Sequence, residues 1–213
     1  MRIFTVVTCC LGLLSAIPIC GEENCSDFAL RMLMEGNERY VRDERIHPNQ
    51  SEAHREKLKE KQEPFAVILS CSDSRIAPEL IFDRGLGDTF VVRVAGNVAG
   101  QMGLESIYYA VDQLKACLVM VLGHESCGAV KGVVAGGDAI RDMPTIARMI
   151  EPAISQAKGM EGDFLPHVIE LNVQRVKKQL ENDPFLKKFV QEGKLKIVGG
   201  YYHLSSGKVT LVP

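Results

Sequence analysis

The chain has 213 residues and a formal net charge of -2 at pH 7, with 46% hydrophobic and 24% charged residues. This length supports one domain with a substantial core and leaves too few residues for two comfortable ones. The composition is typical of a soluble globular protein, and the near-neutral charge gives no basis for nucleic acid as a partner.

The N-terminal segment differs from the rest of the chain. Residues 3–19 are an apolar run without charge, which follows Arg2 and precedes the acidic segment GEEN. A short basic start, an apolar middle and a polar exit are typical of a secretory signal peptide. We therefore expect residues 1–21 to be a signal peptide and the protein to be exported, to the periplasm.

Two alternatives to export with cleavage stay open. A run of about 17 apolar residues lies at the short limit of a membrane span, so an uncleaved N-terminus would leave the protein anchored to a membrane or in the cytoplasm. Cys20 also raises lipidation, although IPIC lacks the small residues expected before a lipidated cysteine.

A helix is expected directly after this segment, at residues 26–41, with Ser26 or Asp27 as its cap. Because it is amphipathic and precedes a polar arm, residues 51–62, we expect it to pack on a partner subunit. Strands and helices then alternate. The strands are expected at 65–69, 89–94 and 117–122, and the helices at 78–84 and 103–114.

The second half of the chain continues with helices and ends in strands. We expect helices at 144–157, interrupted near Pro152, at 168–180 and at 184–192. The tail 194–213 is typical of a strand followed by a hairpin. Strands separated by helices pair in parallel. The predicted fold is therefore α/β, with a mostly parallel central sheet flanked by helices and an antiparallel C-terminal edge hairpin, in one domain spanning residues 26–213.

Seven cysteines in an exported chain would ordinarily suggest disulfides. Their positions argue against this, because only Cys71 and Cys127 occur among other residues that can carry chemistry. The other five lie in the N-terminal segment, just before the first helix or at the start of a strand: Cys9, Cys10, Cys20, Cys25 and Cys117.

Reactive residues appear at the ends of two predicted strands. One strand runs into CSDSR, residues 71–75, and another runs into GHESC, residues 123–127. Ligands collect at the carboxyl ends of strands in α/β sheets, so Cys71, His124 and Cys127 are expected to converge on one crevice. Two thiolates and an imidazole suit Zn2+, and three protein ligands leave the fourth tetrahedral position open, as a catalytic zinc requires. One zinc per chain is predicted.

Asp73 and Arg75 follow Cys71 at alternate positions, so in an extended chain the three side chains project to the same side. Asp73 can accept a hydrogen bond from water at the metal, and Arg75 can hold the carboxylate away from the metal by a charge-assisted pair. Each feature alone is more often structural: a buried cysteine, a chance HxxC or a surface ion pair. Their conjunction favours a catalytic site.

These motifs resemble those of the β-class carbonic anhydrases. The likeness extends, in order, over PELIFDRGLGDTFVVRVAGN, SIYYAV, VLGHESCGAVKG and IVGGYYHLSSGKV. The resemblance implies a zinc enzyme that reversibly hydrates carbon dioxide to bicarbonate and a proton, assembled as a homodimer or a higher even homo-oligomer. It implies Cys71, His124 and Cys127 as the zinc ligands and Asp73 and Arg75 as the catalytic pair.

The resemblance also implies four substrate-binding residues. Gln62 matches a pocket glutamine nine positions before the first ligand, and Phe90 and Tyr109 match two further pocket residues. Gly128, directly after the last ligand, is where the backbone would approach the substrate.

Two competing functions stay open. The same site could hydrolyse carbonyl sulfide or carbon disulfide, which a comparison of turnover would decide. Alternatively, Cys71 and Cys127 could be a thiol pair in a non-enzymatic zinc or redox protein. The presence of Asp73 and Arg75 counts against this second alternative, and zinc content would test it.

Overall fold

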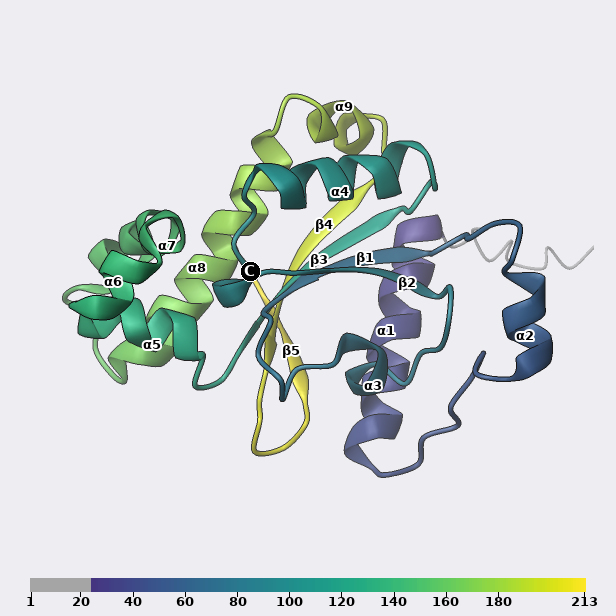
Figure 1. Ribbon diagram of the computed structural model, residues 1–213, viewed down its shortest axis with the longest axis horizontal. Helices are drawn as coiled ribbons and strands as arrows, with labels where there is room; N and C mark the ends of the chain where they lie inside the picture. Colours follow the sequence, from purple (N-terminus) through teal and green to yellow (C-terminus); the bar gives the residue numbers. More distant parts are fainter. Residues whose placement is uncertain (1–23) are drawn as a thin grey trace, which may run out of the picture.

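A five-stranded sheet forms the centre of the protein, in a computed structural model that describes residues 24–213 (Figure 1). The predicted signal peptide, residues 1–21, lies outside the described residues. The strand order is β2-β1-β3-β4-β5, and all neighbouring pairs are parallel except β4 and β5. The predicted fold class is therefore confirmed. The strands are β1 (Ala66–Ser70), β2 (Thr89–Arg93), β3 (Leu118–His124), β4 (Lys196–Tyr202) and β5 (Val209–Val212).

Helices cover both faces of this sheet. One core cluster joins one face to side chains of α4, α5, α7, α8 and α9, and a second joins the other face to α1 and α3. No helix between residues 24 and 213 combines the length and hydropathy that a bilayer crossing requires. The helices are α1 (Cys25–Val41), α2 (Glu52–Lys57), α3 (Pro78–Ile81), α4 (Gln101–Asp112), α5 (Gly128–Ala135), α6 (Asp138–Asp142), α7 (Pro144–Ala157), α8 (Phe164–Asn182) and α9 (Leu186–Gln191), with one 3-10 turn, η1 (Ala95–Asn97).

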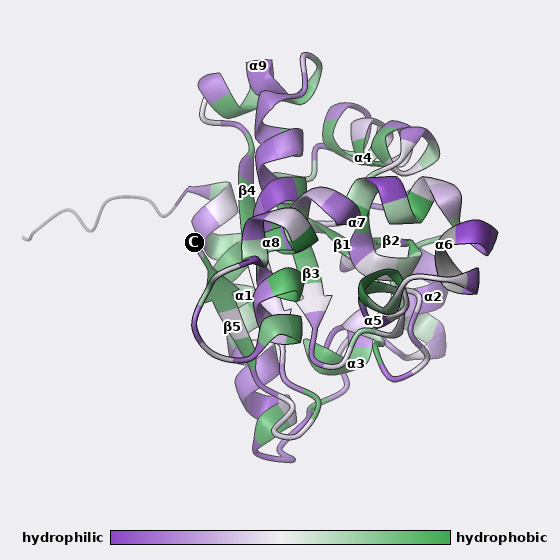
Figure 2. Cartoon of the chain, turned by 90° about the vertical axis from the view of Figure 1, so that its left-hand side faces the viewer, coloured by the Kyte–Doolittle hydropathy of each residue, from purple (hydrophilic) through white to green (hydrophobic). Residues whose placement is uncertain are grey.

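The central strands are buried on both faces. Every residue of β1 and of β3 is buried, which explains why their sequences are almost continuously apolar rather than alternating. Figure 2 shows hydrophobic residues along these strands and hydrophilic residues on the outward side of α8. Since the two strands are parallel neighbours, both end at the same edge of the sheet, where Cys71 and His124 lie.

Several helices differ from the sequence predictions. Helix α1 begins at Cys25, and its cap is Asn24, whose side chain accepts a hydrogen bond from the amide of Asp27. Helix α7 runs unbroken through Pro152. Its buried residues Ile150 and Ala153 stand on either side of the proline, so packing on the core holds the helix together where local propensity alone would interrupt it.

A disulfide joins Cys25 to Cys117, which corrects the expectation that neither cysteine forms one. The two residues are 92 positions apart in the sequence. They meet because Cys25 opens α1, Cys117 directly precedes β3, and α1 packs on the face of β3.

Helix α1 packs on its own chain through its apolar side, and its predicted contact with a partner subunit stays a prediction. Ala29 and Leu33, on the apolar side of this helix, are fully buried in the second core cluster of their own chain. This side of α1 is therefore covered within the subunit.

Candidate metal centre

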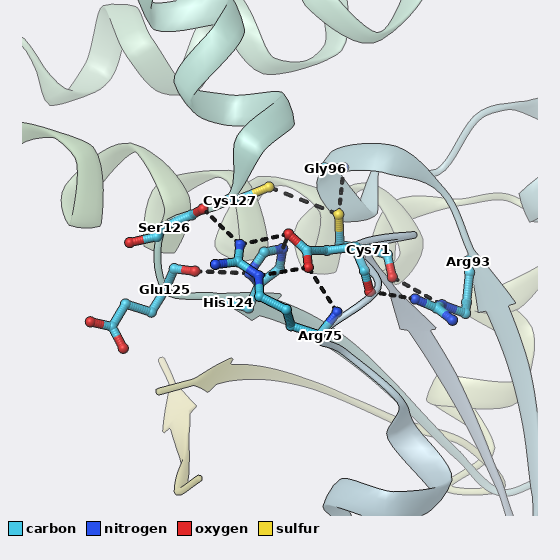
Figure 3. Close-up of polar contacts among 9 residues, drawn as sticks. Cys71, Arg75, Arg93, Gly96, His124, Glu125, Ser126 and Cys127 are labelled. Atoms are coloured by element: carbon cyan, nitrogen blue, oxygen red, sulfur yellow. Dashed lines mark hydrogen bonds and ion pairs between the residues drawn. The ribbon is translucent and has the colours of Figure 1, made fainter. Parts of the chain in front are cut away.

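Three predicted ligands meet at the carboxyl edge of the sheet. Cys71 follows β1, His124 is the last residue of β3, and Cys127 caps α5. The turn between the last two contains Ser126 at a positive φ of 54°, which folds the chain back so that Cys127 faces Cys71. One ligand atom from each of Cys71, His124 and Cys127 lies within 4.8 Å of the others, and all three residues are buried (Figure 3).

The imidazole of His124 is oriented for metal binding. Its Nδ1 lies 2.9 Å from the carbonyl oxygen of Glu125, and because a carbonyl can only accept, Nδ1 carries the proton. The lone pair is therefore on Nε2, which is buried and has no hydrogen-bond partner among the described residues. An unpaired nitrogen facing two sulfur atoms is the donor set that a zinc ion satisfies, so the residues fit this metal.

The two thiols share one proton in the metal-free chain. Their Sγ atoms lie 3.9 Å apart. The pKa of Cys71 is lowered to about 4, because it accepts a hydrogen bond from Cys127 and another from the Gly96 amide, and these outweigh its burial. The pKa of Cys127 is raised, because its S–H donates to Cys71 and because it is buried. A metal ion that binds both sulfurs would displace the remaining proton.

Asp73 lies beside this cluster and is held by Arg75. Its Oδ1 accepts hydrogen bonds from the Nε and the backbone amide of Arg75 at 2.9 and 3.0 Å, and its Oδ2 accepts one from a terminal guanidinium nitrogen at 2.7 Å. These contacts hold the pKa of the carboxyl well below its usual range. Its Oδ2 stands 3.9 Å from His124 Nε2. The carboxylate is therefore ionised, fixed in orientation and next to the three ligands.

Two residues that the sequence analysis did not single out also support the site. Arg93, at the end of β2, donates to the carbonyl oxygens of Cys71 at 3.1 Å and of Asp73 at 2.7 Å. The Gly96 amide donates to Cys71 Sγ at 3.3 Å. A signal for Arg93 was present, since it ends an apolar strand, as the predicted ligands do.

The predicted substrate residues are divided between two places. Gly128 follows Cys127 at the start of α5 and is exposed. Gln62 and Tyr109, by contrast, line a hollow of about 820 Å³ in front of the amino end of β1. The Phe90 ring is 6.2 Å from that of Tyr109, and Phe90 pairs with Val67 near the same end of the sheet.

Within one chain, these three residues therefore stand apart from the Cys71 cluster. Phe90 pairs with Val67, and Cys71 lies four positions further along the extended chain, a distance of about 13 Å. Their roles in substrate binding stay predictions.

Comparison with known proteins identifies the family to which the chain is similar. The carbonic anhydrase family model matches residues 66–209. Carbonic anhydrase 2 of Mycobacterium tuberculosis is 39% identical over 194 residues, which cover 86% of this chain and 91% of that protein. The solved β-carbonic anhydrase CcaA has a TM-score of 0.69 at 25% identity and covers 85% of this chain and 94% of its own. The enzyme CafA of Aspergillus fumigatus has a TM-score of 0.65 at 27% identity, covering 76% and 82%.

A mostly parallel sheet with helices on both faces and a Cys–His–Cys cluster at its carboxyl edge defines an α/β protein with a candidate metal site at its strand ends. The family match and the similarity to relatives over most of the chain make the assignment specific. The chain belongs to the β-class carbonic anhydrases, and it is an enzyme of that class.

Proposed function

We propose that the protein catalyses the reversible hydration of carbon dioxide to bicarbonate and a proton with one zinc ion per chain. The observation that carries the proposal is the unpaired, buried Nε2 of His124, which faces the Sγ atoms of Cys71 and Cys127 beside an ionised Asp73. When bound, Zn2+ supplies the Lewis acidity that makes water a nucleophile near neutral pH.

The protein groups around the ligands have separate tasks in this proposal. Asp73 accepts a hydrogen bond from the reacting water and orients its lone pair. Arg75 keeps the carboxylate in that position, since it occupies both carboxylate oxygens. Its guanidinium also lies 3.4 Å from the carbonyl oxygen of Ser126, so it connects the Asp73 turn to the turn before Cys127.

Ligand variants test this proposal. We expect Cys71→Ser, His124→Ala and Cys127→Ser each to lose zinc and carbon dioxide hydration, measured by metal analysis and stopped-flow pH-indicator assays. The matched control is the double variant Cys25→Ser/Cys117→Ser, which removes two cysteines away from the cluster and should keep one zinc per chain. A variant that is metal-free and fully active would refute the site assignment.

The same assays separate the competing functions. Faster turnover of carbonyl sulfide or carbon disulfide than of carbon dioxide by the zinc-loaded protein would favour the hydrolase. A protein without stoichiometric zinc after native purification would favour the thiol pair.

We also propose that the protein is exported to the periplasm as an even-numbered homo-oligomer. The apolar segment 3–19 motivates export, and the Cys25–Cys117 disulfide supports it, because structural disulfides persist in oxidising compartments. Peptide mass spectrometry of the native protein under non-reducing conditions should find this disulfide and a mature N-terminus near residue 21. A protein in the cytoplasm that retains residues 1–20 would contradict export.

A further inference from the structure

The loop after β2 presents one backbone amide to a predicted metal ligand. The Gly96 N–H donates to Cys71 Sγ at 3.3 Å. Gly96 has a φ of +71°, and a Cβ at this position would come within 2.9 Å of Ile150 Cδ1. The positive φ favours a glycine here, and a glycine changes backbone conformation more readily than other residues unless its own polar groups are held.

Helix α8 holds this loop at two carbonyl groups. Asn172 Nδ2 donates to the Gly96 carbonyl oxygen at 2.8 Å, and Gln179 Nε2 donates to that of Ala99 at 3.0 Å. Asn172 and Gln179 are seven residues apart, or about two helical turns, so they lie on the same side of the helix. Of the two, only Asn172 bonds to the residue that contacts Cys71.

The burial of Asn172 argues for a role beyond packing. The residue is 1% exposed, and its Oδ1 has no hydrogen-bond partner among residues 24–213. Leaving a buried acceptor unpaired destabilises a protein, and an apolar side chain of similar volume would avoid that cost. What an asparagine provides here, and an apolar residue would not, is the hydrogen bond from its Nδ2 to the Gly96 carbonyl oxygen.

We propose that Asn172 is a positioning residue for the metal centre: it fixes the conformation of Gly96 so that the Gly96 amide donates to Cys71 Sγ. This inference rests on the proposed metal site. A hydrogen bond to a ligating sulfur stabilises its ionised form and fixes its direction, as partners around metal ligands commonly do. The loop then contributes to metal retention although none of its residues is a predicted ligand.

The test is the rate at which zinc leaves the intact protein. We expect Asn172→Leu, which keeps the number and branching of the side-chain heavy atoms but removes the donor, to release zinc to an excess of a chromophoric chelator about tenfold faster than the wild type. The control, Gln179→Leu, removes the neighbouring hydrogen bond from the same helix to the same loop and should stay within about twofold of the wild type. Equal release rates from zinc-loaded wild type and Asn172→Leu would overturn the inference.

A spectroscopic readout addresses the hydrogen bond itself. In the wild type loaded with 113Cd, the Gly96 amide proton should show scalar coupling to the metal through Cys71 Sγ, and Gln179→Leu should retain this coupling while Asn172→Leu loses it. Absence of the coupling in the wild type would overturn the inference without any variant having to fold. If the wild type bound neither zinc nor cadmium, the proposed metal site would fail and this inference with it. Metal binding with unchanged coupling in Asn172→Leu would overturn the role of Asn172 alone.

Discussion

The Asp73 carboxylate depends on one partner for its orientation. Both of its oxygens accept hydrogen bonds from Arg75, and one of them stands 3.9 Å from His124 Nε2. Since the pKa of Asp73 is depressed, any stability from this pair is fully present above the ordinary value of 3.8 and is lost as the pH falls below it. The pair therefore persists across the neutral range, and Asp73 acts as a hydrogen-bond acceptor throughout it.

Removing the guanidinium should separate metal binding from catalysis. In Arg75→Leu the carboxylate is free to turn toward the metal, so we expect one zinc per chain to be retained while carbon dioxide hydration falls by about 10- to 100-fold. In the metal-free variant, where no zinc can bind the carboxylate, the Asp73 carboxyl pKa, followed by NMR titration, should rise toward 3.8. Arg141→Leu, which removes an exposed arginine that pairs with Asp138 and Asp142, is the control and should leave hydration unchanged. Wild-type activity in Arg75→Leu would show that Asp73 needs no such restraint.

The two free sulfurs are close enough to react with each other when no metal holds them. Cys71 Sγ and Cys127 Sγ are 3.9 Å apart, and Cys71 provides a thiolate because its pKa is lowered to about 4. We predict that metal-free protein treated with oxidised glutathione forms a Cys71–Cys127 disulfide: the two sulfurs lose two electrons and their one shared proton, and glutathione disulfide is reduced to one glutathione thiol and one glutathione thiolate. Zinc-loaded protein should resist, because both sulfurs are then bound as thiolates.

Thiol labelling followed by peptide mass spectrometry measures this difference. Cys25 and Cys117 provide an internal reference, since they are already joined in both samples. Equal labelling of Cys71 and Cys127 in metal-free protein before and after oxidation would rule out this disulfide.

Among the elements, α1 is attached to the sheet by a covalent bond as well as by packing. The Cys25–Cys117 disulfide closes a loop with a sequence separation of 92, and Leu33 of the same helix is buried in the core. Closing a loop of this size strongly reduces the conformational entropy of the unfolded chain. The disulfide should therefore contribute to stability more than to the chemistry at the opposite end of β3.

The double variant Cys25→Ser/Cys117→Ser measures that contribution. We expect its free energy of unfolding to fall by about 2–5 kcal/mol, with the zinc content unchanged. Urea denaturation of both proteins gives the comparison. Both are measured at the same protein concentration, because the stability of an oligomer depends on it. In the presence of a reductant the two proteins should have equal free energies of unfolding. A difference that persists under these conditions would mean that the loss of stability comes from altered packing.

The sequence predicted those elements whose patterns are local. Cys71 and His124 were placed correctly because an apolar strand that ends in a reactive residue is visible within a few positions. Helix α5 was not predicted, since GAVKGVVA contains two glycines, and its helix is held by burial of Val130 and Val133. The roles of Asn172 and of the Cys25 disulfide depend on contacts between distant segments, which no local pattern encodes.

At the scale of the whole molecule, one chain does not bring all the predicted functional residues together. Gln62 and Tyr109 line the hollow before β1, whereas the Cys71 cluster lies beyond its other end. If Gln62 contributes to carbon dioxide binding, it does so at the metal site of a partner subunit. A symmetric dimer would then pair the amino-end hollow of each subunit with the carboxyl-end cluster of the other.

Subunit complementation distinguishes this arrangement from one in which each chain works alone. We predict that Gln62→Ala and Cys71→Ser homo-oligomers both hydrate carbon dioxide poorly, the first because it lacks the amide and the second because it lacks zinc. When the two are unfolded, mixed in equal amounts and refolded with zinc, a mixed dimer contains one complete site, because the Cys71→Ser subunit lends Gln62 to the intact ligands of the other. Random mixing should restore about a quarter of wild-type hydration activity.

The control mixes Cys71→Ser with a Cys71→Ser/Gln62→Ala double variant, in which no subunit has intact ligands and no recovery is expected. If the hydration activity of the first mixture did not exceed the mean activity of the Gln62→Ala and Cys71→Ser homo-oligomers, Gln62 would not act across the subunit interface.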